Sequence, residues 1–196
     1  RSLPARFRRY LVAVGIFGAG DFSHSLLILA ATTLLTPSMG VVQAAQVAGL
    51  LYVLRNIVQV GTSFPVGVLA DRVGALPVLV GGYALGVLGA ALMALAFVAE
   101  VDRVVVLAGI FVIAGLYVAV QEALEPTVTA GLVEAETRAT SFGLLGAVNG
   151  TGKFISSAGV GAIWTAVSPA AGFAAAAGLM ALGTLSLLGA ARPAGE

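Results

Sequence analysis

Residues 76–99 read LPVLVGGYALGVLGAALMALAFVA, an apolar stretch without a single charged side chain. As an α-helix rising 1.5 Å per residue, this stretch is long enough to cross the roughly 30 Å hydrocarbon core of a bilayer. A membrane-spanning β-strand needs only about 9–11 residues and alternates polar with apolar positions, which these residues do not. The stretch therefore predicts a transmembrane helix.

Five further apolar segments flank this one, separated by charged or turn-forming residues. We place the six segments at 10–36, 42–70, 76–99, 103–125, 141–167 and 170–190. Lipid offers no hydrogen bonds to the backbone, so long spanning segments must satisfy their own polar groups as helices. The sequence therefore predicts an all-α membrane protein with six transmembrane helices.

The composition agrees with this class. Of 196 residues, 59% are hydrophobic and only 10% are charged, whereas a soluble domain has about 25% charged residues. The 26 glycines are typical of membrane helices, where small residues allow close packing. The net charge of +1 gives no reason to expect a nucleic-acid partner. The absence of cysteine excludes disulfides and thiolate metal sites, and we expect no cofactor.

The arginines outside the segments predict the orientation. With the N-terminus inside, seven arginines are cytoplasmic and only Arg103 is external, which follows the positive-inside rule. The seven are Arg1, Arg6, Arg8, Arg9, Arg72, Arg138 and Arg192. We therefore expect both termini on the cytoplasmic side of a membrane, the plasma membrane of a bacterium. Because the chain starts at Arg1 and not at Met, we also expect it to be cut from a longer one.

The longest expected connection divides the chain into halves. We interpret 1–9 as a basic cytoplasmic lead-in, 10–125 as helices one to four, 126–140 as a cytoplasmic loop, 141–190 as helices five and six, and 191–196 as a cytoplasmic tail. These parts form one domain. Units of three helices, an odd number, invert in the membrane, so we expect two inverted three-helix repeats.

Polar side chains inside the apolar segments are the candidate functional residues. A charge near the bilayer centre costs at least about 2.5–3.5 kcal/mol, so it is retained for a reason. We expect a substrate or proton cavity formed by Asp21, His24, Arg55, Gln59, Glu122, Asn149 and Lys153. Carboxylate and imidazole groups are both able to carry protons. The alternative is a purely structural ion pair, or long side chains that reach toward the interface.

Near mid-membrane, this set places Asp21 against two cations, Arg55 and Lys153. Either another segment supplies a further acid, or the cavity accepts an anionic group. The sequence leaves both possibilities open. We interpret Glu125, which precedes Pro126, as a helix-end charge in water.

The stretch Gly67-Val68-Leu69-Ala70-Asp71-Arg72-Val73-Gly74 resembles the G-x-L-A-D-R-x-G signature of the major facilitator superfamily, in the copy between helices eight and nine. Tyr52, Asn56 and Pro65 precede it at similar spacing. The second half also resembles these permeases, in the order Gly115, Tyr117, Glu122, Arg138, Phe142, Gly143, Gly150, Ser157, Gly161, Trp164 and Phe173.

The resemblance covers nearly the whole chain and implies helices seven to twelve of a twelve-helix secondary transporter. It implies that Gly67 and Gly74 allow tight packing and a bend, and that Asp71 and Arg72 form the cytoplasmic signature. By the same likeness, Asp71 faces a helix N-terminus in the other half. Two departures exist: Ala75-Leu76 replaces the usual basic continuation, and Arg138-Ala139 replaces Arg-Gly.

Three functions remain open. The first is transport of a small solute as one half of a secondary transporter, by alternating access, with the N-terminal six-helix half and membrane lipid as partners. The second is a self-contained six-helix transporter that works as a homodimer. The third is a membrane enzyme, sensor or scaffold without transport. The chemistry disfavours an enzyme, because the adjacent Ser23 and His24 point about 100° apart on a helix.

Overall fold

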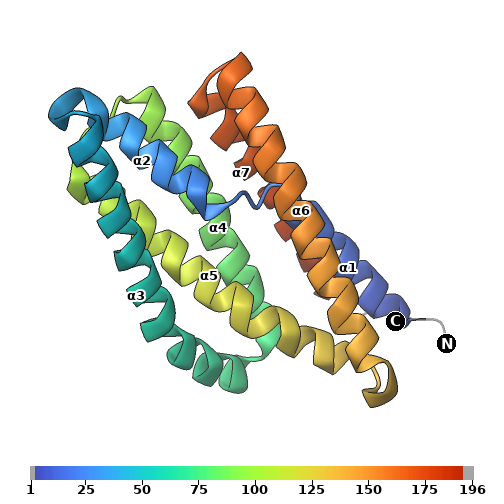
Figure 1. Cartoon of the computed structure of the whole chain (residues 1–196). Helices are drawn as coiled ribbons and strands as arrows, with labels where there is room; N and C mark the ends of the chain where they lie inside the picture. The colour runs from blue at the N-terminus through green and yellow to red at the C-terminus, as the bar shows by residue number, and fades with distance from the viewer. Residues whose placement is uncertain (1–2, 192–196) are drawn as a thin grey trace.

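The computed structural model describes residues 3–191, and all regular structure in this range is helical (Figure 1). The order is α1 (Ala5–Gly18), α2 (His24–Met39), α3 (Val41–Val73), α4 (Ala75–Val98), α5 (Val104–Leu132), the 3₁₀ turn η1 (Ala135–Thr137), α6 (Arg138–Ala166) and α7 (Pro169–Ala191). The cytoplasmic positions predicted for Arg1, for Arg192 and for the tail beyond it lie outside the described residues.

Four of these helices, α3, α4, α5 and α7, are long and apolar enough to cross a membrane. The α2 helix is apolar but has only 16 residues. The α6 helix has 29 residues, but it contains Asn149 and Lys153 and is less apolar. The all-α membrane class is thus supported, whereas six full crossings and their inverted repeat stay predictions.

The first expected segment, 10–36, is not one helix. It breaks at residues 19–23 into α1 and α2. Gly20 lies in this break, and a Cβ atom there would lie 2.5 Å from the carbonyl oxygen of Ala176 on α7, so the close approach of the two backbones requires glycine. Ser23 then caps α2 by accepting a hydrogen bond from the Ser25 backbone N–H at 3.3 Å. Such capping is typical of a helix start.

The expected loop at 126–140 is mostly helix. The α5 helix continues through Pro126 to Leu132, and α6 begins at Arg138, so that the connection is short. Proline ends many helices but is tolerated inside membrane helices where neighbours compensate for the missing hydrogen bond. Pro37 in α2 and Pro65 in α3 are also inside helices.

The bundle has two sides, one with α2 and α3 and the other with α1, α6 and α7. They are joined by α4, by α5 and by residues 19–23, which connect α1 to α2. In Figure 1, α2 lies beside α3, while α1 lies with α6 and α7. The α4 helix packs against both α5 and α7. Buried aromatic rings fill the centre: Phe17 stacks on Tyr83 with ring centroids 3.7 Å apart, and Phe22 meets Phe173 edge-on at 5.0 Å.

Candidate functional site: a charged network at the helix break

Asp21 lies in the break between α1 and α2 and is only 4% exposed. Its Oδ2 atom is 3.4 Å from the Lys153 Nζ on α6. The same oxygen accepts a hydrogen bond from Gln121 Nε2 on α5 at 3.3 Å. A buried charge is tolerated when it is both paired and hydrogen-bonded, so Asp21 ties the break to two helices that are distant in sequence.

Close backbone packing places α6 against this break. A Cβ atom on Gly152 would lie 2.8 Å from the carbonyl carbon of Gly18, so a larger residue there would push α6 away. Two residues after Asp21, the Ser23 backbone N–H donates to Ser157 Oγ at 2.9 Å. Lys153 reaches Asp21 because the glycines on both helices let the backbones approach.

Arg55 on α3 forms a second group of contacts and is 3% exposed. One terminal nitrogen is 2.7 Å from His24 Nε2, and the other donates to Asn56 Oδ1 and Gln59 Oε1, each at 2.7 Å. Gln59 Nε2 donates in turn to Glu122 Oε2 on α5. Among residues 3–191, the side chains that hydrogen-bond directly to Arg55 are uncharged, and its hydrogen-bonded link to the acid Glu122 passes through Gln59.

Glu125 on α5 forms a third group. It is 3% exposed, and its carboxylate accepts hydrogen bonds from the Tyr83 hydroxyl at 2.7 Å and from Asn149 Nδ2. Tyr10 on α1 donates to the Glu125 backbone oxygen at 3.1 Å. The expectation that Glu125 is a helix-end charge in water is therefore wrong, because α5 continues past Pro126 and keeps Glu125 inside the bundle.

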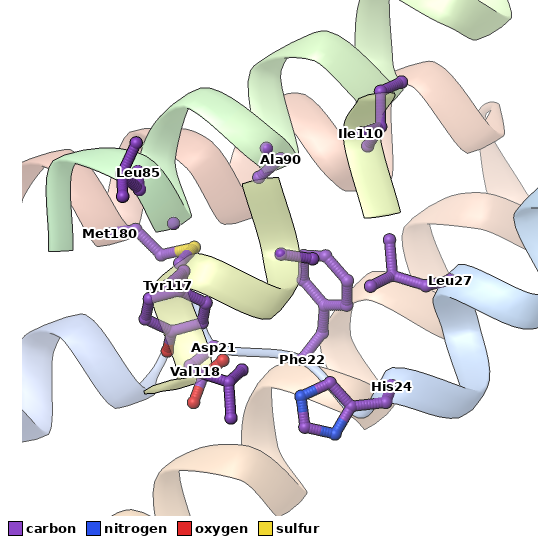
Figure 2. A pocket seen from close by; sticks show the side chains of 13 residues that line it. Asp21, Phe22, His24, Leu27, Leu85, Ala90, Ile110, Tyr117, Val118 and Met180 are labelled. Carbon is purple, nitrogen blue, oxygen red and sulfur yellow. The ribbon is translucent and has the colours of Figure 1, made fainter. Parts of the chain in front are cut away.

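Two hollows adjoin the network. A small cavity of about 30 Å³ lies beside Asp21, His24 and Tyr117, and it has room for one or two water molecules. Figure 2 shows the Tyr117 and Asp21 side chains on one side of it and Leu27 on the other. The Tyr117 hydroxyl is buried and has no hydrogen-bond partner among the described residues.

The second hollow is an open groove of about 370 Å³ between α5 and α6, which we call the α5–α6 groove. Its lining consists of Gln121, Glu122, Glu125, Pro126, Phe142, Leu145, Gly146, Asn149 and Lys153. Three of the seven site residues proposed from the sequence line this groove: Glu122, Asn149 and Lys153.

The seven residues thus lie in three adjoining groups rather than one. Asp21 pairs with Lys153; His24, Arg55, Gln59 and Glu122 form a chain; and Asn149 contacts Glu125. Sequence reasoning missed Gln121, Tyr83 and Glu125. Gln121 and Glu125 are one helical turn apart, so the apolar run continuing beyond Pro126 was the signal that could have placed both on one face.

The signature turn is separate from this network. Gly74 has φ of +97° between α3 and α4, a conformation suited to glycine, and this supports its expected role in a bend. Asp71 and Arg72 are exposed at the end of α3. Gly67 differs from expectation: it lies inside α3, and a Cβ atom there would meet nothing within 4 Å, so no close packing within the described chain requires it.

An all-helical bundle with apolar outer surfaces, four helices long enough to cross a bilayer and charges gathered around a broken helix defines the class of integral membrane proteins. Comparison with known proteins gives the family. The model of the major facilitator superfamily matches residues 11–196, and the chain belongs to this superfamily of membrane transporters.

One relative illustrates the extent of the likeness. A Methanocaldococcus jannaschii protein described as an uncharacterized MFS-type transporter is 27% identical over 169 residues, which cover 86% of this chain and 41% of the relative. The chain therefore spans about two fifths of the length of that protein.

Proposed function

We propose that this chain is one six-helix half of a secondary transporter, equivalent to helices seven to twelve, that moves a small solute by alternating access. The superfamily match and the greater length of the relative support this proposal. In it, α1 and α2 together form one interrupted crossing, and α3 to α7 supply the other five. Both termini then face the cytoplasm, across a bacterial plasma membrane.

The observation that carries the proposal is the Asp21–Lys153 pair at a helix break. Transporters of several folds bind solutes where a membrane helix is discontinuous, because free backbone groups and charges can meet the cargo there. The pair stands beside the Arg55–His24 contact and the α5–α6 groove. We propose that Asp21, His24, Arg55, Gln59, Glu122, Asn149 and Lys153 form one wall of the transport pathway.

We also propose that the same residues couple transport to protons. Asp21 and His24 both line the small cavity, and both are groups able to carry protons. In a complete transporter, Asp21→Asn should abolish transport driven by a pH gradient while substrate exchange without a gradient persists. Undiminished pH-driven transport in this variant would rule out Asp21 as the proton carrier.

Reconstitution tests the need for a second half. The chain alone in liposomes should move no substrate, and co-expression with six preceding helices of the parent protein should restore transport and cover Asp71. Saturable transport by the chain alone, with a two-fold dimer in the bilayer, would establish a homodimer instead. Absence of transport in both preparations would favour a sensor or scaffold.

Orientation has a separate test. Single cysteines placed at positions 72 and 102 should react with impermeant reagents from opposite sides, 72 from the cytoplasm and 102 from outside. Labelling of both positions from one side would contradict the proposed topology.

A further inference from the structure

The α5–α6 groove carries more negative than positive charge. Of its lining residues, Glu122 and Glu125 are acidic and only Lys153 is basic. Lys153 is already engaged, because its Nζ is 3.4 Å from the Asp21 carboxylate outside the groove. The nearest other cation of the network, Arg55, reaches Glu122 only through Gln59. The groove thus differs from the mid-membrane set of Asp21, Arg55 and Lys153, in which cations outnumber acids.

Glu125 receives no cation at all among its described hydrogen-bond partners. Its carboxylate oxygens accept from Tyr83 and Asn149, both uncharged, and the residue is 3% exposed. Neutral donors stabilise a buried carboxylate but do not cancel its charge. The groove therefore has two acidic side chains that no cation of its own lining contacts directly.

Gln121 supplies an independent observation. It lines the groove and is 6% exposed, and its Nε2 donates to Asp21. Its Oε1 atom is buried and has no hydrogen-bond partner among the described residues. A buried acceptor without a donor is costly, so this oxygen points to a ligand that brings an N–H or O–H group.

The three acceptors suit one chemical group. Gln121, Glu122 and Glu125 are at positions i, i+1 and i+4 of α5, and all line the groove. A primary ammonium has three N–H donors and a full positive charge, whereas a carboxylate or phosphate has only acceptors. Beside these acceptors, Phe142, Leu145 and Pro126 give the groove an apolar wall.

We propose that the α5–α6 groove binds a substrate with a primary ammonium group on an apolar body. The ammonium contacts Glu122, Glu125 and Gln121, and the apolar body packs against Phe142 and Leu145. The volume of about 370 Å³ is within the usual range for small-molecule sites. The assignment of this ligand to transport rests on the proposed function; its binding to the groove does not.

Binding is tested on the purified 196-residue chain in detergent with three ligands of similar size. They are 2-phenylethylammonium, 3-phenylpropionate and neutral 3-phenyl-1-propanol, measured by saturation-transfer NMR and calorimetry. The ammonium compound should bind at least about ten-fold more tightly than the other two, since charge-assisted hydrogen bonds exceed neutral ones. Equal affinities, or tighter binding of the carboxylate, would overturn the proposal.

Variants of Glu122 locate the site, because this residue is exposed and its replacement spares the core. Glu122→Gln should weaken ammonium binding about ten-fold, and Glu122→Lys should abolish it and admit 3-phenylpropionate. Asp102→Asn, in the exposed connection between α4 and α5, is the matched control and should leave binding unchanged. Unaltered selectivity in Glu122→Lys would show that the ammonium binds elsewhere.

Transport in the complete protein separates the two proposals. If the chain binds the ammonium ligand but the complete protein transports nothing, the transport function fails and the groove assignment stands. If the complete protein transports anionic or neutral solutes and the groove does not select the ammonium, the groove assignment fails and the transport function stands.

Discussion

Lys153 and Arg55 are both cations inside an apolar bundle, yet their surroundings differ. Lys153 on α6 pairs directly with the buried Asp21 carboxylate and remains 37% exposed. Arg55 on α3 is 3% exposed, and its hydrogen-bond partners in the described part of the chain are uncharged. The two sites show that a buried cation can be satisfied by pairing with a carboxylate or by hydrogen bonds to uncharged side chains, with different consequences when a partner is lost.

The largest effect should come from removing Lys153. Lys153→Met leaves the Asp21 carboxylate buried with one amide donor, and stability should fall by about 2–3 kcal/mol, below the roughly 3–5 kcal/mol of fully buried pairs because Lys153 is partly exposed. Asp21→Asn should cost less, about 1 kcal/mol, because the partly exposed Lys153 can reach water. Unfolding in SDS followed by circular dichroism measures both. The double variant should be more stable than Lys153→Met, and a strictly additive loss would contradict the pairing.

A somewhat smaller effect should come from separating the helices that hold this pair. In Gly152→Ala, the new methyl group meets the Gly18 backbone, which should cost about 1.5 kcal/mol through overpacking. Gly150→Ala is the matched control on the same helix, since a Cβ atom there meets nothing within 4 Å, and its stability should be equal or slightly higher. Equal losses in both variants would show that the close approach does not matter.

The smallest effect on stability is expected at Arg55. Arg55→Gln removes the cation without leaving a buried charge behind, because His24, Asn56 and Gln59 are its direct partners. The loss should be about 1 kcal/mol, because the cost of burying the guanidinium charge disappears together with its charge-assisted hydrogen bonds. The same SDS titration measures it. A loss larger than that of Lys153→Met would show that Arg55 is paired with an acid in the membrane-embedded state.

The sequence predicted long apolar helices well and their interruptions poorly. The segment 76–99 corresponds to α4 (Ala75–Val98) almost residue for residue, because no polar side chain competes with the apolar pattern there. The break at 19–23 was missed, and the chain there packs closely on α7: the approach of Ala176 to Gly20 is a tertiary contact that no local pattern encodes.

The candidate site was predicted in part for a similar reason. Depth along a helix placed Asp21 and Lys153 at comparable levels, and the structure joins them. The sequence did not reveal that Glu125 belongs to the network, because Pro126 was interpreted as the end of a helix. Whether a membrane helix continues through a proline depends on the neighbouring helices rather than on the helix propensity of proline.

The prolines inside α2, α3 and α5 have a mechanical consequence. Each lacks the backbone N–H that would bond the carbonyl four residues earlier. One backbone hydrogen bond of the helix is therefore absent at each of Pro37, Pro65 and Pro126. A helix that lacks one of these hydrogen bonds bends more easily at that point than elsewhere. In α3 and α5 the compliant point follows the network residues Arg55, Glu122 and Glu125 along the chain. We therefore expect the C-terminal parts of α3 and α5, beyond these prolines, to tilt relative to the charged network, which stays fixed.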